Sequence, residues 1–240
     1  MEHFHDKIQG WFTFPWLYSE MVRRFPSGSH FVEVGCWRGC SAAYMGVEIV
    51  NSKKDIKFDC IDWFKGAPSA HSEGNYLLGT PEGRKLLDEN EPYHTCVKNL
   101  SPFADFVTIT QGLSKELAPL YKDASLDFVF LDASHDYKDL REDLDLWGPK
   151  VKPDGVFAGH DLGMSGVNLA LCEYFDEDPP PNSHKDFKKI NYGFTRQEHY
   201  GYKKKLGGCW IWDKKIHGEA PADPPCYKNL HIDHGGWVKG

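Results

Sequence analysis

Residues 126–161 read LDFVFLDASHDYKDLREDLDLWGPKVKPDGVFAGHD. Two short apolar runs, residues 126–132 and 155–159, are bounded by polar residues or glycine, which is typical of buried strands. Between them, residues 137–147 place apolar side chains on one helical face and charged ones on the other, and Pro149 follows. A strand, a helix and a second strand in this order predict a βαβ unit with parallel strands.

The same alternation extends toward both ends of the chain. Further strand candidates are residues 31–35, 57–62, 106–110 and 208–212. We therefore predict an α/β protein with a Rossmann-like, doubly wound, mostly parallel sheet that carries helices on both faces. Ligands bind such sheets at the carboxyl ends of the strands, so functional residues are expected just after each strand.

The 240 residues are enough for one large domain. We assign residues 1–30 to an N-terminal helical segment, 31–215 to the main domain and 216–240 to an extended C-terminal tail. The aromatic cluster at residues 11–18 is expected to dock on the core, with a lid or a dimer contact as the alternative. The sequence thus leaves a homo-oligomer open.

The composition excludes several kinds of partner. Lys+Arg number 28 and Asp+Glu 35, a formal charge of −7 without a basic block, so we expect no nucleic-acid and no membrane partner. No apolar run approaches the roughly 20 residues of a membrane span. The seven cysteines include no CxxC pair, which argues against disulfides or structural zinc, and we predict a soluble, cytoplasmic protein.

The first strand ends in a glycine turn, EVGCWRGCS, which opens a helix. Gly35 can turn sharply, Gly39 lets a ligand approach the backbone, and the helix that begins near Ser41 offers unpaired N–H groups. The spacing differs from the GxGxxG dinucleotide fingerprint, and Glu33 suits a cationic or hydroxyl-bearing ligand better than a phosphate. An ordinary strand–turn–helix is the alternative.

The second strand ends at Asp62, roughly 20 residues after the glycine turn, where a carboxylate can accept both hydroxyls of a ribose. Trp63 beside it could stack on a purine, or simply pack. Two weak signals in the expected order are stronger than either alone, and they favour a ligand that contains ribose.

The fourth and fifth strand candidates end in FLDASHDY and FAGHDL. Neighbouring parallel strands would place Asp132 beside His160 and Asp161. Two carboxylates and an imidazole can bind a divalent cation; carboxylates favour Mg²⁺ or Mn²⁺, whereas imidazole favours the later transition metals. The alternative is that Asp132 or Ser134, and Asp161, only cap helices.

In this order, FVEVGCWRGCS, FDCID and the stretch at 126–161 resemble the class I S-adenosylmethionine-dependent methyltransferases. The similarity is to the metal-dependent, small-molecule O-methyltransferase branch, which contains the catechol and macrolide-sugar enzymes. It covers about residues 10–213 and is most specific at 31–62 and 126–161. It implies a seven-stranded sheet whose last strand, residues 208–212, is antiparallel to the others.

The resemblance also implies roles for individual residues. Those it places at S-adenosylmethionine are Glu33, Gly35, Gly39, Ser41, Asp62, Trp63, Gln111, Gly112, Ser114 and Asp132. Glu33 and the two glycines would line the methionine part, Asp62 would take the ribose hydroxyls, and residues 111–114 would contact the adenine. The implied metal ligands are Asp132, His160 and Asp161. A histidine is rare in this metal pair, so His160 departs from the family pattern.

The expected reaction transfers a methyl group from S-adenosylmethionine to a hydroxyl of a small polar acceptor, assisted by Mg²⁺ or Mn²⁺. His135, which falls where the catechol enzymes keep a lysine base, or Asp132 would be the general base. We favour a sugar acceptor, in a glycan or a glycosylated natural product, with a pocket shaped by loops at residues 63–83 and 163–205. The alternatives are a metal-independent methyltransferase of phenols or other small molecules, a nucleotide-dependent oxidoreductase, and a binding protein that keeps only the cofactor pocket.

Overall fold

The computed structural model describes residues 1–66, 80–176, 208–219, 230–233 and 236–239. Six strands of this part form one sheet in the order β3-β2-β1-β4-β5-β6. Their bounds are β1 (Ser29–Val34), β2 (Ile56–Asp62), β3 (Val107–Gln111), β4 (Leu126–Leu131), β5 (Val151–Gly159) and β6 (Trp210–Asp213). β1 to β5 are parallel and β6 is antiparallel to β5. The Rossmann-like, mostly parallel sheet is confirmed, but the described residues supply six strands in place of the predicted seven.

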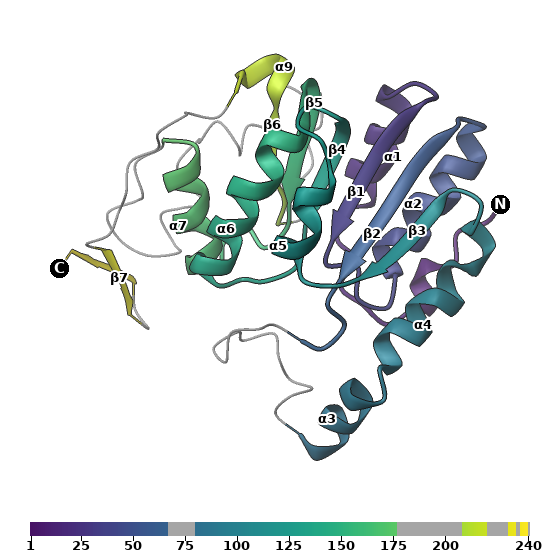
Figure 1. Cartoon of the computed structure of the whole chain (residues 1–240), viewed down its shortest axis with the longest axis horizontal. Helices are drawn as coiled ribbons and strands as arrows, with labels where there is room; N and C mark the ends of the chain where they lie inside the picture. Colours follow the sequence, from purple (N-terminus) through teal and green to yellow (C-terminus); the bar gives the residue numbers. More distant parts are fainter. Residues whose placement is uncertain (67–79, 177–207, 220–229, 234–235, 240) are drawn as a thin grey trace.

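Helices cover both faces of the sheet, as predicted (Figure 1). The α-helices are α1 (Pro15–Arg24), α2 (Cys40–Ser52), α3 (Pro81–Asp88), α4 (Glu91–Leu100), α5 (Ser114–Leu117), α6 (Tyr137–Trp147), α7 (Ser165–Tyr174) and α9 (Lys214–His217). Short 3-10 helices are His5–Lys7, Ser101–Phe103, Ala118–Leu120 and Gly148–Lys150. A separate antiparallel pair, β7 (Leu230–Asp233) and β8 (Gly236–Lys239), lies in the segment that we expected to be an extended tail.

Two apolar clusters hold the layers together, one on each face of the sheet. The first joins α1, α2 and α4 to the sheet and includes the fully buried Phe31 and Phe58. The second joins α6 and α7 to the opposite face and includes Leu144 and Trp210. β4 is buried along its whole length, which explains why its sequence is an almost continuous apolar run.

Most of the N-terminal aromatic cluster docks on the core, as expected, although Trp11 is 69% exposed. Phe14, Leu17, Tyr18 and Met21 are fully buried against the first apolar cluster. Since burying one such side chain contributes about 1.5–3 kcal/mol, α1 is a firmly held part of the fold. No helix in the described ranges combines the length and the apolar character that a bilayer span requires.

The strand order reverses between β1 and β4, so the chain leaves these neighbouring strands in opposite directions along the sheet. β2 and β3 lie on one side of this switch point, and β5 and β6 lie on the other. A crevice for a ligand is expected at the carboxyl ends of β1 and β4.

Candidate active site

Two glycines shape the turn after β1. Gly35 has a φ of +95°, and a Cβ there would lie 2.2 Å from the carbonyl oxygen of Asp132, so only glycine lets the ends of β1 and β4 approach so closely. Gly39, with a φ of +83°, immediately precedes α2. A Cβ at Gly39 would meet Leu100 at 3.1 Å, so this glycine also serves the packing of α2 against α4.

Glu33 is the penultimate residue of β1, two positions before Gly35, and is completely buried. The Ser41 hydroxyl donates a hydrogen bond to its Oε1, while Oε2 has no partner of normal geometry in the described part of the chain. Burial raises the pKa of Glu33 to about 8, although the Ser41 bond and the Tyr18 hydroxyl lower it in part. An orphaned, buried acceptor at this position fits a ligand that brings its own donor, such as the ammonium group of a methionine.

Asp62 ends β2 with its carboxylate held in place by the backbone. Oδ2 accepts from the Trp37 amide at 2.7 Å and Oδ1 from the Phe64 amide at 2.6 Å. Burial raises the pKa of Asp62, and these backbone bonds oppose the rise. Each oxygen keeps a second lone pair, so the carboxylate can still accept a pair of ribose hydroxyls. Trp63 beside it is 38% exposed, which leaves its ring available for stacking.

The residues predicted to contact the adenine, 111–114, begin at the end of β3 and have different surroundings. Gln111 exchanges two amide hydrogen bonds with Asn90, at 2.9 and 3.1 Å. The Gly112 amide donates to the Asp62 carbonyl at 2.9 Å, which continues the β2–β3 pairing and keeps residue 112 near the end of β2. The Ser114 hydroxyl instead accepts from Trp147 Nε1 at 2.8 Å, a contact between α5 and α6. Ser114 therefore lies beside the predicted adenine region with its hydroxyl already bonded to α6.

The ends of β4 and β5 bring the three predicted metal ligands together. One ligand atom from each of Asp132, His160 and Asp161 lies within 4.8 Å of the others. His160 Nδ1 is 3.5 Å from Asp132 Oδ1 and 3.3 Å from Asp161 Oδ1. Asp161 has a φ of +59°, a left-handed conformation that aspartate tolerates better than most residues. The site thus offers one nitrogen and two carboxylates.

His135 joins this group through a hydrogen bond that the sequence did not reveal. Its Nε2 lies 2.8 Å from Asp161 Oδ2, and its buried Nδ1 has no hydrogen-bond partner in the described part. The helix-capping alternative is not supported for the two aspartates, since Asp136 precedes α6 and Met164 precedes α7. Only Ser134 assists a helix start, by accepting from the Asp136 amide at 3.3 Å.

Comparison with known proteins decides the family. The profile described as a methyltransferase domain matches residues 32–162, more than half of the 240 residues. The chain belongs to this methyltransferase family. The predicted family is thereby confirmed, with S-adenosylmethionine as the methyl donor, and the oxidoreductase alternative is set aside.

Two individual proteins show how far the likeness to this methyltransferase extends. The O-methyltransferase NovP has a similar fold, with a TM-score of 0.54 and 18% identity over 83% of this chain and 78% of NovP. The uncharacterized protein y4gI of Sinorhizobium fredii (strain NBRC 101917 / NGR234) is 25% identical over 87 residues. That match covers 36% of this chain and 10% of y4gI.

The charges at the β4–β5 end of the methyltransferase compensate one another. Burial raises the pKa of Asp132 to about 6, partly offset by the bond to His160. The pKa of Asp161 lies well below its usual range because bonds from His135 and His160 outweigh burial. Burial lowers the pKa of His160, but the two aspartates outweigh it and raise the value to about 10. The hydrogen bond to Asp161 likewise raises the pKa of His135. A divalent cation would replace protons in this cluster and meet the same two negative charges.

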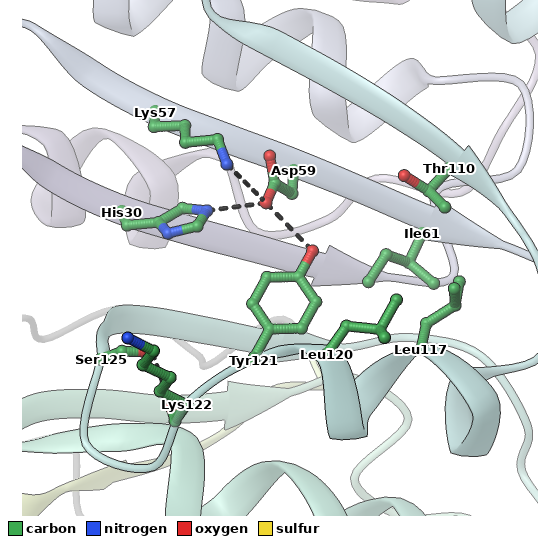
Figure 2. A pocket seen from close by; sticks show the side chains of 10 residues that line it. All are labelled: His30, Lys57, Asp59, Ile61, Thr110, Leu117, Leu120, Tyr121, Lys122 and Ser125. Carbon is green, nitrogen blue, oxygen red and sulfur yellow. Dashed lines mark hydrogen bonds and ion pairs between the residues drawn. The ribbon is translucent and has the colours of Figure 1, made fainter.

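A separate cavity of about 370 Å³ lies over the same sheet, lined by residues of β2 and β3 and of the segment that precedes β4. Figure 2 shows Lys57, His30 and Tyr121 converging on one oxygen of Asp59, which is almost completely buried. The hydrogen bonds from His30 and Tyr121, with the charge of Lys57, outweigh burial and lower the pKa of Asp59. None of the predicted site residues lines this cavity, so it is distinct from the candidate active site.

Proposed function

We propose that this methyltransferase moves a methyl group from S-adenosylmethionine to a hydroxyl of a small polar acceptor, with a divalent cation held by Asp132, His160 and Asp161. The observation that carries the proposal is the meeting of these three ligand atoms within 4.8 Å. They lie at the switch point, where Gly35 brings the turn after β1 against Asp132. Their side chains keep 14 to 16% exposure, so an ion and a hydroxyl can reach them. We favour a sugar as acceptor.

The described residues divide the chemistry between them. Glu33 would bind the ammonium group and Asp62 the ribose of the methyl donor, which aligns the sulfonium for in-line attack. Asp132, His160 and Asp161 would hold the cation, which would lower the pKa of the acceptor hydroxyl and fix its orientation. The acceptor oxygen gives up its proton, forms a bond to the methyl carbon, and the electron pair of the broken carbon–sulfur bond stays on sulfur. The products are the methyl ether and S-adenosylhomocysteine.

Of the two predicted bases, we assign proton removal to Asp132. Its carboxylate belongs to the group of ligand atoms that would hold the cation, so it would lie beside the acceptor hydroxyl that the cation orients. His135 presents one ring nitrogen to Asp161, and its other ring nitrogen is buried, so an acceptor hydroxyl does not reach it in this arrangement. We therefore give His135 a positioning role, which is to orient Asp161.

The test is a panel of hydroxylated acceptors, sugars and phenols, incubated with S-adenosylmethionine and analysed for a mass gain of one methyl group. We expect a sugar to be methylated, EDTA to abolish the reaction, and added Mg²⁺ or Mn²⁺ to restore it. If EDTA changes nothing, the metal-independent alternative is correct. The cytoplasm is the compartment we propose, because all six described cysteines are free thiols.

A further inference from the structure

The N-terminal segment that precedes β1 reaches the candidate metal centre. The Thr13 hydroxyl lies 3.0 Å from His160 Nε2. The next residue, Phe14, is completely buried, with its ring 4.5 Å from that of Phe130 and 5.0 Å from the imidazole of His160. The burial of Phe14 therefore keeps Thr13 beside His160, although 147 positions separate the two residues along the chain.

The two ring nitrogens of His160 face different partners. Nδ1 faces Asp132 and Asp161, while Nε2 faces Thr13. An imidazole binds a metal through its unprotonated nitrogen, and the hydrogen bond at the other nitrogen decides which one is free. If Nε2 carries the proton and donates it to the Thr13 oxygen, Nδ1 is left as the ligand atom on the side of the carboxylates.

We propose that Thr13 is a positioning residue that accepts a hydrogen bond from His160 Nε2 and so directs Nδ1 to a divalent cation. The inference rests on the metal part of the proposed function. It gives the N-terminal segment a role in the site, although residue 13 lies outside the matched residues 32–162. Because the buried Phe14 already holds the backbone in place, the contribution of Thr13 to the site comes from its hydroxyl.

Loss of an outer-shell partner typically costs 10- to 100-fold in metal affinity. Thr13 is exposed, so water competes for its hydrogen bond and we expect the lower end, about tenfold. Thr13→Val removes the hydroxyl at nearly constant shape. Thr13→Ser keeps the hydroxyl and is the matched control.

The experiment titrates Mn²⁺ into the wild-type protein, Thr13→Val and Thr13→Ser, and records the electron spin echo modulation of the bound ion, which reports a directly coordinated imidazole nitrogen. Binding of S-adenosylhomocysteine is measured alongside. We expect nitrogen coupling in the wild type and in Thr13→Ser. For Thr13→Val we expect about tenfold weaker Mn²⁺ binding with reduced coupling, and unchanged binding of S-adenosylhomocysteine.

Three other results would overturn the inference, and they can be told apart. If Thr13→Val matches the wild type, Thr13 does not position His160, while the proposed metal site stands. Equal losses in Thr13→Val and Thr13→Ser, or weakened binding of S-adenosylhomocysteine, would mean that the segment acts through packing alone. If the wild-type protein binds no Mn²⁺, the metal part of the proposed function fails together with the inference.

Discussion

Buried or partly buried carboxylates lie on both sides of the switch point, but their hydrogen-bond partners differ. On β1 and β2, Glu33 and Asp62 accept from a serine hydroxyl and from backbone amides, and burial raises both pKa values. Just after β5, the carboxylate of Asp161 lies between two imidazoles, which lower its pKa. On the first side, carboxylate oxygens can still accept further hydrogen bonds. On the second side, the two imidazoles already compensate the negative charge.

This contrast separates two kinds of ligand. Buried carboxylates bonded only to neutral donors suit a ligand that brings hydroxyls or an ammonium group, as the methyl donor does. Carboxylates grouped with imidazoles suit a cation that takes the place of protons. If the comparison is right, substitutions on one side should leave binding on the other side nearly intact.

The largest effect is expected for Asp161→Asn. Asparagine tolerates the left-handed backbone at this position but lacks the negative charge, so Mn²⁺ affinity and turnover should fall roughly 100-fold or more, above the usual cost of an outer-shell partner. Calorimetry and methyl-transfer assays measure the two losses. Asp145→Asn, on the exposed side of α6, is the control and should behave as wild type. Full Mn²⁺ affinity in Asp161→Asn would remove this residue from the site.

For Asp62→Asn we expect a smaller loss of affinity, and the ligand affected is S-adenosylhomocysteine in place of the metal ion. Hydrogen bonds to a charged group contribute about 1.5–3 kcal/mol, so affinity for S-adenosylhomocysteine should fall roughly 10- to 100-fold. Mn²⁺ affinity should remain at the wild-type value, because Asp62 lies on the β2 side. Parallel loss of both affinities would show that the two sides do not act separately.

The smallest expected effect concerns the stability of the fold and a buried carboxylate that lies outside both sites. Asp143 on α6 is almost fully buried, and burial raises its pKa from 3.8 to about 7 despite a bond to Ser114. The folded state thus binds the proton more tightly than the unfolded state, so stability should decline as pH rises from about 4 to about 7. Asp143→Asn should flatten that decline and be the more stable protein at pH 8, by at least about 1 kcal/mol. Urea unfolding at pH 5 and pH 8 measures this, and an unchanged slope would contradict it.

Much of the fold follows from the sequence pattern. The apolar periodicity of residues 137–147 predicted α6 with its observed bounds, because that face packs on the core and Pro149 follows. The parallel strands at whose carboxyl ends Glu33, Asp62, Asp132 and His160 lie were also predicted, since short buried runs determine where the strands end. β5 begins four residues earlier than the predicted run, because Val151 already pairs with Leu126 ahead of a β-bulge.

The contacts between distant segments could not be predicted in the same way. The pairs Thr13–His160, His135–Asp161 and Ser114–Trp147 join residues whose spacing follows no period, and each depends on how one element lies against another. Periodicity shows which side chains are buried but not which atoms they meet. The greater parts of the loops predicted to shape the acceptor pocket, within residues 63–83 and 163–205, lie outside the described residues.

The most direct test of two separate sites on one sheet edge is a crystal structure with Mn²⁺ and S-adenosylhomocysteine, with anomalous diffraction to locate the ion. The account predicts one manganese peak about 2.0–2.3 Å from His160 Nδ1 and from an oxygen of both Asp132 and Asp161. It also predicts the ribose hydroxyls on the Asp62 carboxylate. An ion bound elsewhere, or an occupied cofactor pocket whose ribose avoids Asp62, would contradict it.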